Sequence, residues 1–192
     1  MKRVAVVALS LLGATAQAGI IVKAGAYQLV HTTQFIDEQT VEFYHLPALV
    51  LGFELEDGHR PESGNSVRSL GLEFFHVSYS VAQSTREAQG QLNDSAVMFN
   101  GKWIYNLRNK IFPFAGAGIG GSYGEIDLQG FDHKFYDSHL ALAVQVSVGA
   151  EFTFGRRERY WLYSEVKRYT NSGSAPDSSG TAAFVGFRAN LE

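Results

Sequence analysis

Hydrophobic and polar side chains alternate along most of this 192-residue chain. Between His139 and Phe154 every even-numbered position is apolar, whereas the odd-numbered positions are small or polar. A period of two residues indicates a β-strand, because successive side chains of a strand point to opposite faces. The alternation runs through a segment longer than the usual globular strand of about 3–10 residues. This length fits a tilted membrane strand that extends beyond the bilayer.

The same period recurs in eight segments of the chain. They lie near 20–30, 45–55, 67–80, 96–107, 111–126, 138–154, 159–169 and 181–191. Bacterial outer-membrane barrels have an even number of strands, and a sheet in lipid must close because lipid offers no hydrogen-bond partners. The pattern therefore predicts an all-β fold, an eight-stranded antiparallel up-and-down transmembrane β-barrel. A soluble lipocalin-like barrel is the alternative, but its apolar residues would face inward.

The connections between the predicted strands alternate in length. Long, polar connections lie near 31–44, 81–95, 127–137 and 170–180, and tight, charged turns lie at 108–110 and 155–158. Long extracellular loops and short periplasmic turns are typical of outer-membrane barrels. The segment 56–66 breaks this alternation, since a short turn is expected there. It is either a genuine periplasmic loop or a sign that a strand end is misplaced.

The N-terminal residues have the order of a secretory signal peptide. Lys2 and Arg3 form a basic region, Val4 to Gly13 form an apolar region, and Ala16 to Ala18 give an A-x-A cleavage pattern. We therefore expect residues 1–18 to be a signal peptide and residues 19–192 to form an outer-membrane β-barrel domain. The alternative is a buried N-terminal strand or helix.

Composition narrows the classes of function. The chain has no Cys and therefore no disulfides in an oxidising compartment. Removing Lys2 and Arg3 from the 16 basic residues leaves 14 against 19 acidic residues, and this acidity argues against a nucleic-acid partner. Aromatic residues near strand ends predict interfacial girdles, with Tyr163 an interior exception if Glu165 faces inward. They are Tyr44, Trp103, Tyr105, Tyr123, Tyr160, Trp161, Tyr163 and Tyr169.

A glycine-rich stretch carries the fingerprint of a dinucleotide-binding loop. Gly116, Gly118 and Gly121 spell G-x-G-x-x-G. That fingerprint needs a helix after it, whereas the chain continues through Tyr123 into a polar segment. With a period of two, Gly116, Gly118 and Gly120 share one face. We therefore predict that the glycines make room inside a narrow barrel, and we expect no cofactor.

Two strands resemble those of a known family. The sequence FPFAGAGIGGSYGEI, residues 112–126, resembles the mid-barrel strand of the OmpA/OmpX-like small outer-membrane β-barrels. The sequence YWLYSEVKRYT, residues 160–170, is similar to their penultimate strand. The resemblance covers the layout of residues 19–192 and implies a location in the outer membrane of a Gram-negative bacterium. Such barrels commonly end on an aromatic residue, whereas this sequence ends on Leu191 and Glu192.

Charged residues collect on the faces that are predicted to line the interior. They are Lys23, Glu54, Glu73, Lys102, Glu151, Glu165, Lys167 and Arg188. Uncompensated charge in a tight interior is costly, so this balance of acids and bases predicts an interior polar network that fills the barrel. The alternatives are a gated ion path, as in a small pore, and a carboxylate pair for acid–base chemistry. Eight strands leave little lumen for a continuous channel.

His76 and Ser78 are two residues apart and share a face of the strand near 67–80. A His and a Ser on one strand resemble the outer-membrane lipid A deacylases, which are also small barrels. A serine nucleophile needs a histidine base and an acid that orients it. Glu73 faces the other side of the strand, and no acid on a neighbouring strand is an evident substitute. We therefore expect a polar pair at the membrane interface, with an outer-leaflet lipid A-modifying hydrolase as the alternative.

Four histidines fall in or beside two predicted external loops: His31, His45, His133 and His139, with Asp132 and Asp137 nearby. Histidine and carboxylate are common metal ligands, but this spacing matches no strong template. We expect solvated loop residues and no metal site.

The pattern as a whole predicts a non-enzymatic, monomeric barrel with an envelope structural role or with surface interaction through its external loops. A scaffold of this kind carries its specificity in the loops. The expected partners are outer-membrane lipid and lipopolysaccharide, and a surface ligand at the loops.

Overall fold

Ten β-strands make up nearly all of the part of the chain that the computed structural model describes, which comprises residues 17–29, 33–36, 39–44, 47–56, 66–84, 89–107, 110–129, 135–154, 160–172 and 178–191. The strands are β1 (Gln17–Leu29), β2 (Thr33–Ile36), β3 (Gln39–Tyr44), β4 (Pro47–Glu56), β5 (Ser66–Ser84), β6 (Gln89–Tyr105), β7 (Ile111–Gln129), β8 (Phe135–Phe154), β9 (Tyr160–Asn171) and β10 (Gly180–Leu191). None of the described residues belongs to a helix that could cross a membrane. Most of the predicted leader, residues 1–16, and most of the segment 56–66 lie outside the described residues, as does Glu192.

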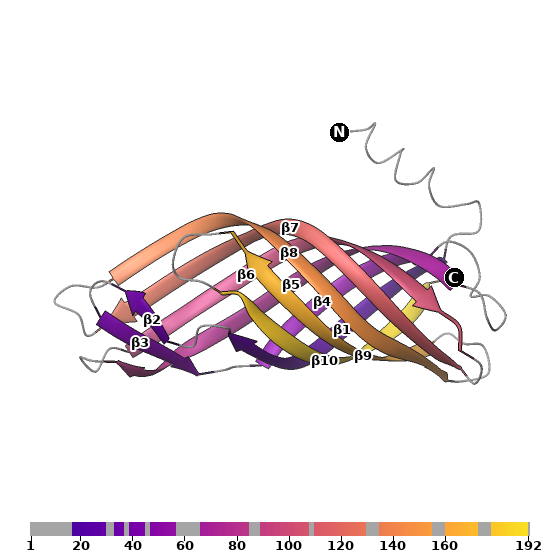
Figure 1. The fold of residues 1–192 in the computed structure, drawn as a ribbon, viewed down its shortest axis with the longest axis horizontal. Helices are drawn as coiled ribbons and strands as arrows, with labels where there is room; N and C mark the ends of the chain where they lie inside the picture. Colours follow the sequence, from indigo (N-terminus) through magenta and orange to yellow (C-terminus); the bar gives the residue numbers. More distant parts are fainter. Residues whose placement is uncertain are drawn as a thin grey trace, which may run out of the picture.

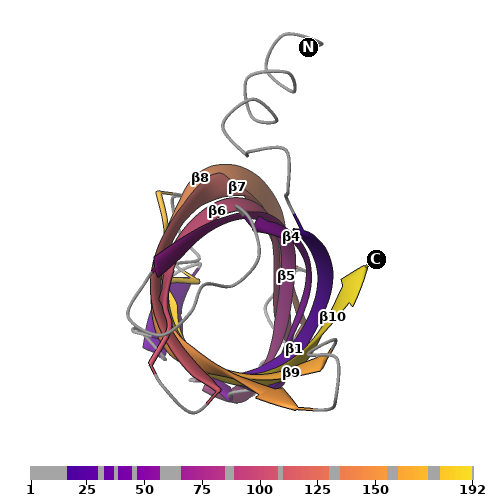
Figure 2. The same ribbon diagram turned by 90° about the vertical axis from the view of Figure 1, so that its right-hand side faces the viewer.

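Eight of these strands close into a barrel. The order around it is β1, β4, β5, β6, β7, β8, β9 and β10, and β10 pairs with β1 to complete the ring. All neighbours are antiparallel, and each barrel strand pairs with the barrel strands that precede and follow it in the chain. Figure 2 shows the strands arranged around this ring. The predicted eight-stranded antiparallel up-and-down barrel is confirmed.

The stagger of the strands fixes the shape of the barrel. A path along paired residues that starts at Ala18 passes through Leu55, Leu70, Gly101, Ala117, Val146, Arg168 and Thr181, and returns to β1 at Gln28. The return point is ten residues further along β1. In an eight-stranded barrel this shift corresponds to a strand tilt of about 40°, within the usual range for barrels.

One end of the barrel carries the β2–β3 hairpin, at the left of Figure 1, and we call it the hairpin end. Tyr44 pairs with Ser80 and Leu49 pairs with His76, so β3 continues β4 along the edge of β5. The expectation of an irregular loop over 31–44 is therefore wrong. The long β5 offers an edge on which the short alternation of Thr40 to Phe43 can pair.

The strands also run further toward the hairpin end than the alternation predicts. β5, β6, β7 and β8 extend into the predicted loops near 81–95 and 127–137. The opposite end, which we call the turn end, contains the tight turn before β7, where the Leu107 amide donates to the Ile111 carbonyl at 3.1 Å. Lys110 in this turn adopts a positive φ of 63°.

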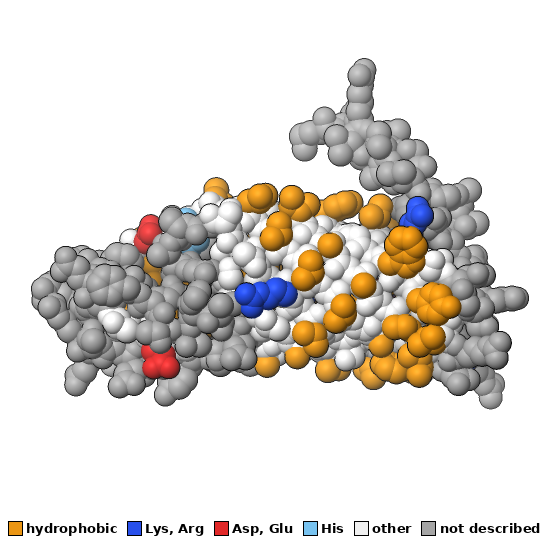
Figure 3. Space-filling model, in the orientation of Figure 1, with side chains coloured by type: hydrophobic (Ala, Val, Ile, Leu, Met, Phe, Trp, Pro, Cys, Tyr) orange, Lys and Arg blue, Asp and Glu red, His pale blue; other side chains and the backbone are white. Residues whose placement is uncertain are grey.

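The outer surface of the barrel is apolar and the inner surface is mixed. Along β6, Val97 and Phe99 are exposed, whereas Met98 and Asn100 are buried. Along β8 the exposed side chains include Leu142, Val144, Val146 and Val148. Figure 3 shows apolar side chains over the barrel wall on one face of the molecule. A soluble barrel would reverse this arrangement, so the exterior has the character of a lipid-facing surface.

Aromatic side chains divide between the two faces. Trp103, Tyr105, Tyr123 and Tyr160 are exposed, as an interfacial girdle requires. The rings of Phe154, Tyr160 and Phe187 pack together at the turn end, with centroids 5.5–6.3 Å apart. Trp161, Tyr163 and Tyr169 are buried in the interior. The expectation of girdle positions for Trp161 and Tyr169 is wrong, because each faces the interior, opposite to its exposed neighbours Tyr160 and Thr170.

Candidate functional site

The barrel interior holds a network of buried ionic side chains. The structure buries all eight side chains that the alternation places inside, and it adds Glu56. The network therefore contains four bases and five acids: Lys23, Lys102, Lys167 and Arg188 with Glu54, Glu56, Glu73, Glu151 and Glu165. Glu56 escapes sequence analysis because it stands at the start of an irregular segment, although it continues the alternation from Glu54 as the last residue of β4.

Glu73 of β5 is at the centre of the network. Its carboxylate accepts from Lys23 Nζ at 2.5 Å and from Lys167 Nζ at 2.6 Å. Lys23 also donates to Glu165 at 2.7 Å. The Gln145 amide donates to Glu73 at 3.2 Å. Since β5 and β9 are four strands apart in either direction around the ring, the bond between Glu73 and Lys167 joins opposite walls of the barrel.

A second group of ion pairs lies closer to the turn end. The Arg188 guanidinium donates to Glu56, and it lies 3.6 Å from carboxylate oxygens of both Glu54 and Glu151. Lys102 donates to Glu54 and lies beside the Tyr163 hydroxyl. The five acids exceed the four bases by a single charge, which limits the cost of burying them together.

Aromatic rings enclose the central group from both sides. Lys23 Nζ lies 4.5 Å from the centre of the Tyr163 ring, and Lys167 Nζ lies 5.6 Å from the centre of the Phe184 ring. Tyr163 belongs to an apolar cluster toward the turn end, and Phe184 belongs to a larger one toward the hairpin end. The central ionic group therefore lies between two apolar clusters.

Glycines make room for the charged side chains. Gly116 pairs with Lys102 across the strands, and Gly118 pairs with Asn100. A Cβ on Gly116 would lie 3.0 Å from Lys102 Cγ. Gly52 and Gly186 stand in the same relation to Glu73 and Lys23. The GAGIGG stretch thus lies inside a strand that continues to Gln129, so it lacks the strand-to-helix turn that a dinucleotide fingerprint requires.

A smaller polar cluster surrounds Asp94 toward the hairpin end. The buried Asp94 carboxylate accepts from the Tyr169 hydroxyl at 3.2 Å and from the Ser178 hydroxyl. The Asn171 amide donates to Ser178 at 2.6 Å. Because Ser178 lies just before β10, these bonds fix the approach to β10 against the interior of the barrel.

The expectation that His139 is a solvated loop residue is wrong. β8 begins at Phe135, so His139 lies within a strand and pairs with Gly124 on the inner face. Its ring occupies the space that Gly124 leaves, since a Cβ there would lie 2.5 Å from His139 Cε1. His31, His45, His133 and Asp132 lie outside the described residues, and Asp137 is exposed in β8. The described part of the chain holds no group of three or more His, Cys, Asp or Glu suited to a metal ion.

His76 and Ser78 lie on the outward face of β5, but the hydrogen-bond partner of His76 is a different serine. His76 Nδ1 lies 2.9 Å from the hydroxyl of Ser95, its cross-strand neighbour on β6. Leu49 flanks His76 on the other side. A triad would also need an acid on the second ring nitrogen, and no bond between His76 and a carboxylate is found among the described residues. The pair has the geometry of a cross-strand contact.

We expect Ser78→Ala and Ser95→Ala to leave the lipid A of a host outer membrane unchanged. The reason is that His76 bonds Ser95 without an orienting acid among the described residues. Lipid A from cells that express wild-type protein, either variant or an empty vector would be compared by mass spectrometry. If lipid A loses an acyl chain in cells with the wild-type protein but keeps it in cells with either variant, the hydrolase alternative would be supported instead.

No protein-family model matches the chain, and no curated protein matches it in sequence. The fold, in contrast, matches solved outer-membrane barrels. OprG from Pseudomonas aeruginosa superposes with a TM-score of 0.58 at 12% identity, over 93% of this chain and 97% of that one. Neisserial surface protein A gives 0.57 at 10% identity, over 92% and 99%. Ail of Yersinia pestis, in complex with the heparin analogue sucrose octasulfate, gives 0.54 at 9% identity, over 92% and 98%.

These similarities establish the fold. The chain has the architecture of the small outer-membrane barrels, and at the level of fold the OmpA/OmpX-like resemblance is confirmed. Identities of 9–12% carry no argument about ligands or activity.

Proposed function

We propose that the protein is a non-enzymatic barrel of the Gram-negative outer membrane that presents its hairpin end to the cell exterior. The observation that carries this proposal is a closed barrel whose exterior is apolar and whose described interior is filled by ion pairs and aromatic rings. A closed sheet with an apolar exterior is the form in which strands can cross lipid. Longer extensions usually belong to the extracellular side, and here they lie at the hairpin end.

The side chains that fill the described interior disfavour the alternative function of a small pore. Glu73 and Lys167 join opposite walls, and apolar clusters lie on both sides of that bond. Water would need a path through side chains that are already in contact with each other. An eight-stranded barrel is just wide enough for its side chains to fill it.

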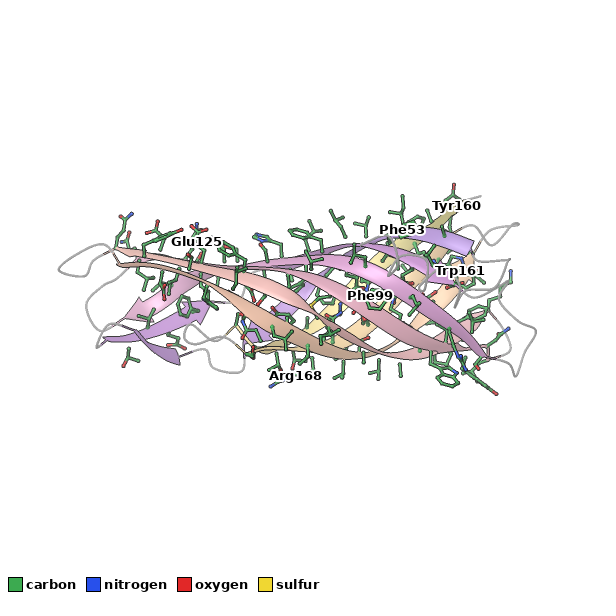
Figure 4. All side chains as sticks on the ribbon, turned by 90° about the horizontal axis from the view of Figure 1, so that it is seen from above. Phe53, Phe99, Glu125, Tyr160, Trp161 and Arg168 are labelled. Carbon is green, nitrogen blue, oxygen red and sulfur yellow. The ribbon has the colours of Figure 1, made fainter. Side chains whose placement is uncertain are left out.

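The extended wall at the hairpin end favours surface interaction over a purely structural role. β5 to β8 continue beyond the last pair between β8 and β9, Ala143 with Asn171. Many of their outward-facing side chains are polar, for example Ser80, Gln91 and Asn93, whereas Tyr136 and Leu140 of β8 are exposed among them. The described charged residues there are acidic, including Glu125, which Figure 4 places toward the hairpin end. A polyanion such as the heparin analogue bound to Ail is therefore a poor ligand for this surface, and a neutral or cationic partner fits it better.

The first test is membrane fractionation combined with heat-modifiability. The full chain with its leader would be expressed in a Gram-negative host, and outer membranes would be run on detergent gels with and without boiling. We expect recovery in the outer membrane and a mobility shift on boiling. Recovery as a soluble periplasmic protein without a shift would overturn the proposal.

An epitope tag inserted between Ile36 and Gln39 tests the orientation. We expect intact cells to bind the antibody, because the insertion point lies between β2 and β3 at the hairpin end. The matched insertion at the turn end, between Leu107 and Lys110, is expected to need permeabilised cells. The opposite result would invert the proposed orientation.

A further inference from the structure

Arg168 is an outward-facing cation on the barrel wall. It lies on β9, is exposed, and donates from Nη1 to the Thr181 hydroxyl of β10 at 3.2 Å. Figure 4 shows its side chain directed away from the barrel. Among the described residues, no carboxylate is paired with Arg168. Its guanidinium therefore keeps donors that the described chain leaves unused.

The surroundings of Arg168 mark the edge of the apolar wall. Its cross-strand partner on β8 is Val146, and the next outward residue toward the turn end is Val166. Both valines are exposed. On the other side Thr181 pairs with Arg168, and Thr170 follows it on β9. Arg168 thus stands where valines give way to threonines, at the level expected of the lipid headgroups.

No other described cation is placed in this way. Lys23, Lys102, Lys167 and Arg188 are buried inside the barrel. Arg68 and Lys110 are exposed at the turn end, and Arg68 lies over the Trp103 ring at 5.4 Å. An arginine on the lipid face of a barrel is costly near the midplane and tolerated near the interface. A guanidinium at that depth that has no carboxylate partner among the described residues is best stabilised by an anion from the membrane itself.

The wall beside Arg168 is apolar on its β8 side. β9 ends at Asn171 and β10 begins at Gly180, whereas β8 continues from its last β9 partner, Ala143, to Phe135. Leu140 on this extension is 83% exposed, and Leu142 is exposed next to it. The described wall therefore places a cation beside a row of exposed apolar side chains on β8.

We propose that Arg168, together with Thr181, binds the phosphate of a phosphorylated glycolipid in the outer leaflet. The guanidinium fork matches phosphate oxygens in a bidentate manner. The acyl chains extend from Arg168 along Val146, Val148 and Val166 toward the turn end, and the sugar headgroup lies on the hairpin side of Arg168. The inference rests on the proposed outer-membrane location and hairpin-out orientation, and it adds a binding residue for the lipopolysaccharide partner that the sequence leads us to expect.

The test measures glycolipid retained by purified barrels. Wild type, Arg168→Gln and Arg68→Gln would be isolated from outer membranes in mild detergent, and bound phosphorylated glycolipid would be counted by native mass spectrometry. Arg68→Gln is the matched control, since it removes the same exposed side chain at the opposite end. We expect about tenfold less retained lipid for Arg168→Gln and no loss for Arg68→Gln. Heat-modifiability of all three proteins establishes that each is a folded barrel.

A second experiment distinguishes binding of the phosphorylated lipid from binding of free phosphate. Purified wild type stripped of lipid would be titrated with the phosphorylated glycolipid, with its dephosphorylated form, and with inorganic phosphate. Tight binding of the phosphorylated glycolipid alone supports the proposal. Equal binding of the dephosphorylated form, or displacement of the lipid by inorganic phosphate, overturns it. Unchanged lipid on a heat-modifiable Arg168→Gln protein also overturns it and leaves the barrel function intact.

Discussion

Replacing Glu73 with leucine is expected to destabilise the folded barrel by about 3–5 kcal/mol. Glu73 accepts from Lys23, Lys167 and Gln145, and all of these side chains are buried. Without its carboxylate, two lysines share Glu165 in an interior that water does not reach. Breaking a buried ion pair costs more than the pair contributes, because the remaining charge is left uncompensated.

Urea unfolding in phospholipid vesicles measures this effect, with the heat-modifiable band as the signal for folded protein. Glu125→Leu is the matched control, because Glu125 faces outward on β7 and is only partly buried. The double variant Glu73→Leu with Lys167→Leu should lose less free energy of unfolding than the two single variants lose together, since it removes both a charge and its partner. Equal stability of Glu73→Leu and Glu125→Leu would contradict a stabilising role for the network.

Replacing Gly120 with valine is expected to abolish the heat-modifiable form. A Cβ on Gly120 would overlap the Val97 carbonyl oxygen and would lie 2.8 Å from Met98 Sδ. The first of these atoms is backbone in the neighbouring strand, so the clash cannot be relieved by a change of rotamer. Overpacking of a core usually costs about 1–3 kcal/mol, and a branched side chain against backbone is expected to exceed that range.

Gly121→Val is the adjacent control. Gly121 faces outward. The atom nearest to a Cβ added there is the Ala141 carbonyl oxygen, at 3.9 Å. The two variants therefore add the same atoms to opposite faces of one strand. We expect Gly121→Val to fold and to shift on boiling as the wild type does. Folding of Gly120→Val with wild-type mobility would contradict the tight interior.

The period-two alternation was enough to predict the barrel and the inward direction of the charged side chains, because the direction of a side chain in a strand depends on parity alone. The ring of strands follows from the same pattern, since lipid requires closure. The β2–β3 hairpin was missed because its alternation spans only a few residues and depends on the edge of β5.

Contacts between side chains of neighbouring strands could not be predicted from the sequence. The choice of Ser95 over Ser78 as the partner of His76 is set by the register of β5 against β6. The inward placement of the His139 ring depends on the absence of a side chain at Gly124 in the neighbouring strand. Both facts need two strands to be aligned, and no single segment contains that information. The carboxylate Glu56 was hidden for a simpler reason, because it stands at a strand end.

The ion pairs that straddle the β1–β10 junction bear on how the barrel acquires its correct alignment. Lys23 on β1 reaches Glu165 on β9, and Arg188 on β10 reaches Glu56 on β4. Each pair therefore joins residues from opposite sides of the junction that closes the ring. A junction slipped by two residues would keep every side chain on its correct face, and hydrophobic patterning alone would accept it. It would, however, separate these buried charges, so the charges select one alignment of the terminal strands among those that the apolar pattern allows.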